Sequence, residues 1–389
     1  MLLRNATLVD GGEVERGAIA VDRETGTIRA TGDPERLDGE RVVSLEGYTV
    51  LPGLVDAHVH LSLSGERSVE DVVGMSDAEL ALVEARNARK TLEAGVTGLR
   101  VMGAAGVDPV VRDAVAVGDL PGPRMTASCR SITVTGGHGH HLGREIDGPH
   151  DARKAVREQA KRGADFVKFM TTGGVTTPGS DPDSVALTDD ELDALVDEAH
   201  RRGLPTATHV HGAEGAVAAA QAGVDTVEHG TFLDDDAIDA LLRHDVTLVP
   251  TLSAPHHIVR NVEAATEEDT RKTRAIYERH VESFERAVEA GVRVAGGTDA
   301  GTPFNHHGSN AVEVEFMATH GMGPLDAIRA MTETAASVAG LDGSGTLADG
   351  TPADLLVVDG DPTADLSRLT DPVAVLKDGR VVSGSLPSA

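Results

Sequence analysis

One pattern of apolar and polar positions recurs along the middle of the chain. A helix-like stretch of mixed polarity ends in Gly, once in Asp, and a short apolar run of β type follows. Gly just after a helix adopts the left-handed conformation without a Cβ penalty, so these joints indicate helix ends. The joints read "EAGVTGLR", "KRGADFVKF", "RRGLPTATH", "QAGVDTVEH", "RHDVTLVPT" and "EAGVRVAGG". Strands that alternate with helices in this way predict βα units and a parallel sheet.

Three helix starts carry recognisable signals. Ser76 with Glu79, and Thr188 with Glu191, have the spacing of capping boxes. The acidic run at residues 234–236 suits a helix N-terminus, where carboxylates oppose the positive end of the dipole. We therefore expect helices to begin at these three places.

The number of βα units predicts the fold. The six joints, the opening "GLVDAHVHL" and the run "MTASCRSITVTGG" give eight candidate strands between about residues 53 and 300. That span matches the roughly 250 residues of a (β/α)₈ barrel. An open, doubly wound sheet is the main alternative, but no Gly-x-Gly-x-x-Gly turn follows an early strand. We predict an α/β fold with a TIM barrel over residues 53–343.

The two ends of the chain follow a different pattern. Residues 1–52 and 344–389 contain short alternating runs separated by Asp-Gly, Gly-Glu and Gly-Thr turns, which is typical of β-hairpins. Neither end has enough apolar residues to bury a core alone. We expect the two ends to combine into one small β-sandwich domain.

Composition narrows the classes of partner. The formal net charge is -28, and six of the 35 basic residues are Lys. An acidic surface repels phosphate, which argues against nucleic acid and anionic membranes as partners. Scarce Lys and few aromatic residues favour a halophilic protein, and the alternative is an acidic protein from a GC-rich bacterium. No signal peptide or membrane-spanning run is recognisable, so we expect a cytoplasmic protein.

Several predicted strands end in residues that can bind a metal. The first strand contains His58 and His60, which lie on one face because side chains alternate along a strand. An H-x-H pair alone is more often structural. Buried polar groups are costly unless paired, however, and the later strands supply four more such residues, Lys168, His209, His229 and Asp299. Cys129 is the single cysteine, so a thiolate metal cage is excluded.

At this point the sequence resembles the amidohydrolase superfamily of metal-dependent hydrolases. The resemblance covers nearly the whole chain. It is carried by "LPGLVDAHVHL", "GADFVKFMTTGGV", "THVHG", "VEHGTFLDDDAI", "GGTDAGTP" and "GTLADGTPADLLVVDGDP". "TVTGGH" and the Gly-rich loop after Lys168 are similar to the subgroup of imidazolonepropionase-like amidohydrolases and Xaa-Pro or Xaa-Arg type dipeptidases.

The resemblance implies two divalent metal ions, most often zinc. His58, His60 and Asp299 would bind one ion, and His209 with His229 the other. Lys168 would bridge them as a carbamate, because an unmodified ammonium group would be repelled by the metals. The alternative for Lys168 is a salt bridge to Asp299. Sites built from His and carboxylate also accept manganese, iron or cobalt.

The same resemblance implies the chemistry. A hydroxide held between two metal ions is nucleophilic at neutral pH. Asp299 would accept its proton and pass it to the leaving amine. His138 would donate to the carbonyl oxygen as negative charge develops there, or else it is a surface-loop histidine.

Substrate contacts are predicted at three further residues. His211 shares the inward face of its strand with His209, and dipeptidase relatives often carry Tyr there. Arg100 and His307 are placed to meet a substrate carboxylate, or to serve the structure. The loop at residues 171–184 is either a lid over the mouth or an ordinary surface loop. The remaining loop histidines are expected to be solvated: His140, His141, His256, His257 and His306.

We therefore predict a hydrolase that cleaves the amide bond of a small substrate, with a dipeptide as first choice. The second choice is a cyclic amide such as an imidazolone, or another non-peptide substrate. Against a strict imidazolonepropionase stands Lys168, which implies two metals. A non-catalytic binding member of the family is the third alternative, but all six ligand positions are filled. A homo-oligomer is compatible with the resemblance.

Overall fold

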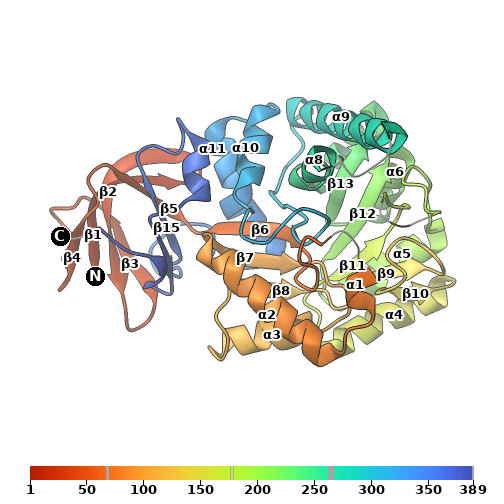
Figure 1. Ribbon diagram of the computed structural model, residues 1–389, viewed down its shortest axis with the longest axis horizontal. Helices are drawn as coiled ribbons and strands as arrows, with labels where there is room; N and C mark the ends of the chain where they lie inside the picture. Colours follow the sequence, from red (N-terminus) through yellow and green to blue (C-terminus); the bar gives the residue numbers. More distant parts are fainter. Residues whose placement is uncertain (67–69, 176, 178, 262–266, 388–389) are drawn as a thin grey trace.

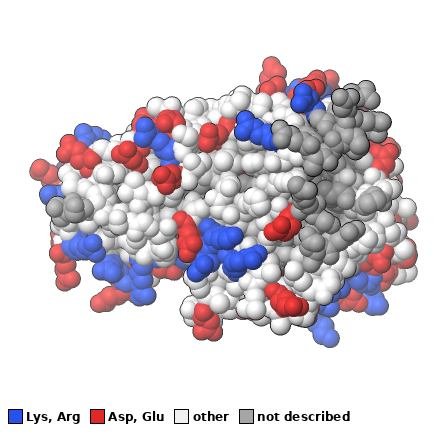
Figure 2. Space-filling model, viewed as in Figure 1, with Lys and Arg blue, Asp and Glu red and all other residues white. Residues whose placement is uncertain are grey.

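The computed structural model describes residues 1–66, 70–175, 177, 179–261 and 267–387. A β-rich part contains both ends of the chain, and an α/β part contains the strands between residues 54 and 249 (Figure 1). Within the described residues, no helix combines the length and the apolar character needed to cross a bilayer. Figure 2 shows acidic side chains along most of the outline of one face, with basic side chains among them.

Both ends of the chain contribute strands to one eight-stranded sheet. Its strand order is β17 (Arg380–Gly384), β16 (Ala374–Lys377), β15 (Leu355–Asp359), β5 (Tyr48–Pro52), β1 (Leu2–Asp10), β2 (Glu13–Asp22) and β3 (Thr27–Gly32), and β4 (Val42–Ser44) also pairs with β1. β15 pairs with β5 in the antiparallel sense, which joins the C-terminal strands to the N-terminal ones. Leu3, Ile19, Val50 and Leu355 are buried together in the core of this part.

The parallel strands of the barrel fall into two hydrogen-bonded groups. The first is β6 (Leu54–Val59), β7 (Val96–Val101) and β8 (Arg124–Ala127). The second is β10 (Arg144–Ile146), β9 (Ile132–Val134), β11 (Val167–Met170), β12 (Thr206–Gly212), β13 (Thr226–Phe232) and β14 (Thr247–Val249). Phe169, Leu195, Val227 and Leu241 belong to a core between strands of the second group and helices.

Two predicted strands differ from expectation. The third is divided into β8 and β9 at Cys129, whose φ is 67° and whose N–H donates to the carboxylate of Asp108 at 2.9 Å. The eighth is not a regular strand. It closes the barrel through single bridges, with Leu248 N donating to Arg293 O and His60 N to Ala300 O, both at 2.9 Å.

The irregular eighth segment has a packing cause. A Cβ at Gly296 would lie 2.3 Å from the sulfur of Met331, and the N–H of Gly296 donates to Ala330 O instead of to a strand. Ala330 begins a π-helical turn, η2 (Ala330–Thr334). A hydrogen bond from outside the sheet therefore fixes the backbone at Gly296, shortly before Asp299.

A 3-10 turn, η3 (Leu366–Thr370), follows β15. The helices surround the parallel strands. They are α1 (Glu70–Val73), α2 (Asp77–Glu93), α3 (Asp108–Ala116), α4 (Pro149–Arg162), α5 (Asp189–His200), α6 (Ala213–Ala222), α7 (Asp235–Arg243), α8 (Ser253–Arg260), α9 (Glu267–Ala290), α10 (Val312–Thr319), α11 (Pro324–Arg329) and α12 (Ala335–Ala339). The expected capping boxes are present at α2 and α5, and Asp234 caps α7 through the N–H of Ala237.

Candidate active site

A cavity of about 190 Å³ lies where the C-terminal ends of the barrel strands meet. That end is where the active sites of such barrels lie. Its lining contains the six residues predicted as metal ligands and two of the other predicted site residues: His58, His60, Lys168, His209, His229, Asp299, His138 and His211. Residues far apart in the sequence are therefore brought to one place.

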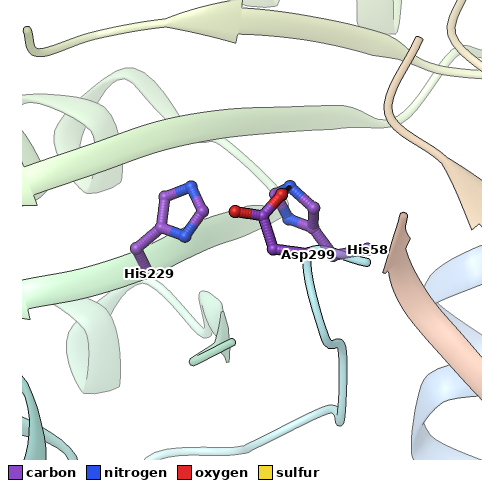
Figure 3. Close-up of side chains that lie close together, drawn as sticks. All are labelled: His58, His229 and Asp299. Carbon is purple, nitrogen blue, oxygen red and sulfur yellow. Dashed lines mark ion pairs between the residues drawn. The ribbon is translucent and has the colours of Figure 1, made fainter. Parts of the chain in front are cut away.

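Three of these side chains could bind one ion in their present positions. One ligand atom from each of His58, His229 and Asp299 can be chosen so that all lie within 4.8 Å of one another. In Figure 3 one carboxylate oxygen of Asp299 points toward His229, and the other lies beside His58. His58 Nε2 and Asp299 Oδ1 are 3.4 Å apart, and both are buried without a hydrogen-bond partner. Two unsatisfied buried polar atoms facing each other fit a bound cation, which would satisfy both.

The backbone is unusual at two of these three residues. His229 has a φ of 71° and Asp299 a φ of 58°, both in the left-handed region that non-Gly residues rarely adopt. Such conformations cost free energy and are concentrated at functional sites. The fold of the chain thus maintains local strain where it presents these two side chains.

Hydrogen bonds from neighbouring groups orient the imidazole rings. His60 Nδ1 donates to the carbonyl oxygen of Gly103 at 2.7 Å, and His209 Nε2 donates to that of Gly173 at 3.2 Å. His229 Nδ1 bonds to the hydroxyl of Thr251 at 2.7 Å. Each ring therefore has one nitrogen engaged by the protein and the other free. This is the arrangement of histidines that ligate metals.

His58 is oriented by a carboxylate that the sequence analysis did not single out. Its Nδ1 lies 2.7 Å from Glu228 Oε2, and Glu228 also forms a buried ion pair with Arg100 and accepts from the hydroxyl of Thr226. Burial alone would raise the pKa of Glu228, but the charge of Arg100 and the hydrogen bond from His58 lower it to about 2. Glu228 is therefore ionised and holds the proton of His58 on Nδ1, which leaves Nε2 free.

Asp56 attaches the first strand to the segment that carries Asp299. Its buried carboxylate accepts from the backbone N–H groups of His58 and Thr298, both at 3.0 Å, and from the side chain of Asn310 at 2.7 Å. His58 and Asp299 are thus kept in register by a network of buried residues outside the cavity lining.

The electrostatics of the site suit cation ligands. Burial lowers the pKa of both His209 and His229 well below the usual value, so both rings are neutral. Burial would raise the pKa of Asp299, but the rings of His58 and His60 outweigh it and hold that pKa well below its usual range. Neutral imidazoles beside an ionised carboxylate form a donor set for a divalent transition metal.

His138 lies against the ligand rings. Its ring centroid is 4.4 Å from that of His209, and its Nδ1 is 2.8 Å from the hydroxyl of Thr177. Burial lowers its pKa to about 4, so the ring is neutral. Gly174 permits this position, because a Cβ there would lie 2.4 Å from the ring. His138 is therefore a half-buried residue that lines the cavity.

Two predicted substrate contacts are corrected by the structure. Arg100 is 2% exposed, does not line the cavity and is paired with Glu228. His307 is also buried outside the cavity lining, and its Nε2 lies 2.9 Å from the carbonyl oxygen of Leu63. Both side chains are occupied by structural bonds because each projects toward the protein interior. His211 does line the cavity, and its Nδ1 bonds to the hydroxyl of Thr231 at 2.6 Å.

Other histidines also depart from expectation. His141 is exposed, as expected, but it also lines the cavity, and its ring centroid lies 3.7 Å from that of His140. His256 is half-buried against the ring of Phe316. His306 is exposed, as expected, and its Nδ1 donates to the carbonyl oxygen of Ser64 at 3.0 Å.

The cavity also contains residues that the strand pattern could not indicate. His280 belongs to α9, lines the cavity and bonds to the carbonyl oxygen of His229 at 2.9 Å. Because His280 lies on a helix, the pattern of residues at strand ends could not indicate it. In the loop at residues 171–184, Val175 and Thr177 line the cavity, while positions 176 and 178 lie outside the described residues. That part of the loop therefore belongs to the site.

Replacing Glu228 by Gln is expected to weaken metal binding and to destabilise the fold. The amide cannot neutralise Arg100, and an uncompensated buried charge costs about 3–5 kcal/mol. Loss of the carboxylate behind a ligating histidine lowers metal affinity by about 10- to 100-fold. Chelator competition measures the affinity, and denaturant unfolding measures the stability.

Two further variants separate these effects. Glu214→Gln removes an exposed carboxylate from α6 and should change neither quantity. The double variant Glu228→Gln with Arg100→Met removes the unpaired charge, so it should recover stability but not metal affinity. Unchanged metal affinity in Glu228→Gln would contradict the role given to this carboxylate.

Comparison with known proteins agrees with this geometry. Residues 49–382 match the sequence profile of the Amidohydrolase family. The chain is 28% identical over 369 residues to ochratoxinase from Aspergillus niger, covering 86% of this chain and 76% of that protein. The crystal structure of a Xaa-Pro dipeptidase with bound methionine in the active site is similar over 98% of both chains, with a TM-score of 0.90 and 32% identity. A prolidase complexed with N-methylphosphonate-L-proline is similar over 99% of both chains, with a TM-score of 0.89 and 27% identity. The predicted barrel with a separate β-rich domain is confirmed.

Proposed function

The chain belongs to the amidohydrolase family and is a hydrolase that acts on carbon–nitrogen bonds, and from this premise we propose that it cleaves the amide bond of a small substrate with the help of two divalent metal ions. The observation that carries the proposal is the pair of buried, unsatisfied atoms, His58 Nε2 and Asp299 Oδ1, among further metal-binding side chains. Core packing has no use for such a pair.

The proposed metal ligands are divided between two ions. His58, His60 and Asp299 would hold one ion, His209 and His229 the other, and Lys168 would bridge both as a carbamate. Zinc is the proposed metal, since neutral imidazoles and carboxylates suit it. When bound, the ions supply Lewis acidity and lower the pKa of a bound water toward neutrality.

The surroundings of Lys168 support the carbamate. Its side chain is 1% exposed. Among the described residues, Asp299 forms ion pairs with His58 and His60, so the alternative salt bridge between Lys168 and Asp299 is not seen. Burial lowers the pKa of Lys168 to about 8, which increases the fraction of neutral amine available at neutral pH. In the proposed modification that nitrogen bonds to the carbon of CO₂ and loses one proton. The product is an anion suited to two cations.

The chain's own residues would handle the protons of the reaction. Asp299 accepts a proton from the attacking water on its carboxylate and delivers it to the leaving nitrogen. His138 donates from Nε2 to the carbonyl oxygen of the substrate. The backbone N–H of Gly139 donates to Thr177 Oγ1 at 3.2 Å, which leaves the Thr177 hydroxyl proton to donate to His138 Nδ1. Donation of the hydroxyl proton to Nδ1 would leave the proton of the neutral ring on Nε2, where donation to the substrate requires it.

Two substrate classes are proposed. Dipeptides, in particular those ending in proline, are favoured by the similarity to the Xaa-Pro dipeptidase and the prolidase. Cyclic amides or other non-peptide amides are favoured by the similarity to ochratoxinase and by His211, which stands where dipeptidase relatives often carry Tyr. A non-catalytic binding role is disfavoured, because all six ligand positions are filled and share one cavity.

A mass-spectrometric screen tests the function. The protein is produced with zinc and bicarbonate, its metal content is measured, and it is incubated in concentrated KCl with a dipeptide library and a cyclic-amide library. We expect hydrolysis of a defined subset of one library and none after chelation. Metal-loaded protein that hydrolyses nothing in either library would contradict the proposed function.

A further inference from the structure

Apolar side chains from several elements line part of the cavity. Leu142, Met170 at the end of β11, and Val175 in the loop that follows line it. Pro255 and Ile258 of α8, with Ile276 of α9, line it from other elements. The cavity measures about 190 Å³, and an apolar cavity of about 150 Å³ already admits a benzene ring. The space therefore suits a ring or a branched alkyl group.

The same cavity offers little to a substrate carboxylate. Arg100 and His307 are both held in structural bonds outside the cavity lining. Among the described residues that line the cavity, Lys168 is the one Lys or Arg, and it is already assigned to the metals. A carboxylate moved from water to this lining would meet hydroxyl and imidazole donors but, among the described residues, no Lys or Arg of its own, and burying a charge without an opposite charge is unfavourable.

We propose that the substrate carries a bulky apolar group beside the scissile amide and no free carboxylate. This inference rests on the proposed function and selects among its substrate classes: capped peptides, aryl amides and alkyl amides over free dipeptides. Ile258 acts as a specificity-determining residue, because it contributes a partly exposed apolar side chain to the wall from α8. Burial of the apolar group against that wall supplies the binding preference.

Three matched compounds test the preference. Alanyl-phenylalanine has a free carboxylate, alanyl-phenylalaninamide has it capped, and alanyl-phenethylamide has the same aromatic group without it. We expect kcat/KM for the two uncharged compounds to exceed that for the free acid by at least about tenfold. Equal values, or a preference for the free acid, would overturn the proposal.

A charge placed in the wall should change this preference. Ile258→Lys adds a cation to the cavity and is expected to shift the ratio toward the free acid by at least about tenfold. Val259→Lys adds the same charge one residue along α8, outside the cavity lining, and Ile258→Met keeps the wall apolar. Both controls should retain the preference of the unmodified protein, and an equal shift in Val259→Lys would refute the role of Ile258.

The failure of this inference can be told from the failure of the proposed function. If metal-loaded protein hydrolyses none of the three compounds, the hydrolytic proposal fails for them. Calorimetric titration of the same protein with the same compounds then measures the preference without turnover. Tighter binding of the two uncharged compounds would support the inference, and tighter or equal binding of the free acid would overturn it.

Discussion

Asp299→Asn is expected to reduce kcat by at least about 10³-fold while leaving the fold intact. An amide cannot accept the proton that the Asp299 carboxylate would take from the attacking water, and proton transfer by a positioned side chain contributes about 10²- to 10⁴-fold. The backbone should tolerate the change, because Asn adopts the left-handed conformation that Asp299 has, with a φ of 58°, more readily than most residues. Initial rates on protein of measured metal content give the comparison.

Asp245 provides a matched control for that variant. It also has a left-handed backbone, with a φ of 55°, but it is exposed and lies outside the cavity lining. Asp245→Asn should keep the rate of the unmodified protein. Circular dichroism and unfolding curves show whether each variant folds. A folded, metal-loaded Asp299→Asn with a near-native rate would contradict the proton-transfer role of this residue.

Most of the fold was predictable because its periodicity is local. Each helix end carries its own signal, such as Gly163 after α4 or Gly223 after α6, and the apolar run that follows marks the next strand. The eighth strand was not predictable in its true form. Its irregularity depends on the contact between Gly296 and Met331, which are distant in the sequence, and on a π-helical turn that no local pattern indicates.

Residues of the candidate site were predictable where they lie at the ends of neighbouring strands. They were not predictable where their contacts depend on a partner across the barrel. His209 and His229 lie on neighbouring parallel strands, so their proximity follows from the repeat. Arg100 was misassigned because its position near the end of β7 does not reveal that its partner is Glu228. An Arg and a Glu at positions of two fully buried strands are nevertheless a usable signal, since buried charges require partners.

Lys168→Ala is expected to empty at least one metal site and to lower turnover by at least about 10²-fold. Lys168 is buried beside the ligand rings, and in the proposed centre its carbamate is the group shared by both ions. Ala supplies no ligand atom, so the cations would face each other without a bridging anion. Metal content by mass spectrometry and rates in parallel test this. Lys161→Ala, an exposed lysine in the last turn of α4, is the control and should behave as the unmodified protein.

Rescue by small acids separates a missing bridge from a damaged fold. The truncated side chain leaves space at the position of the proposed carbamate, so formate, acetate or propionate should restore part of the metal content and of the rate in Lys168→Ala. A misfolded variant would not respond, and Lys161→Ala should be indifferent to the same additions. Full activity of Lys168→Ala without any added acid would remove the bridging carbamate from the proposed mechanism. Loss of activity with both metals retained would instead assign Lys168 a role outside metal binding.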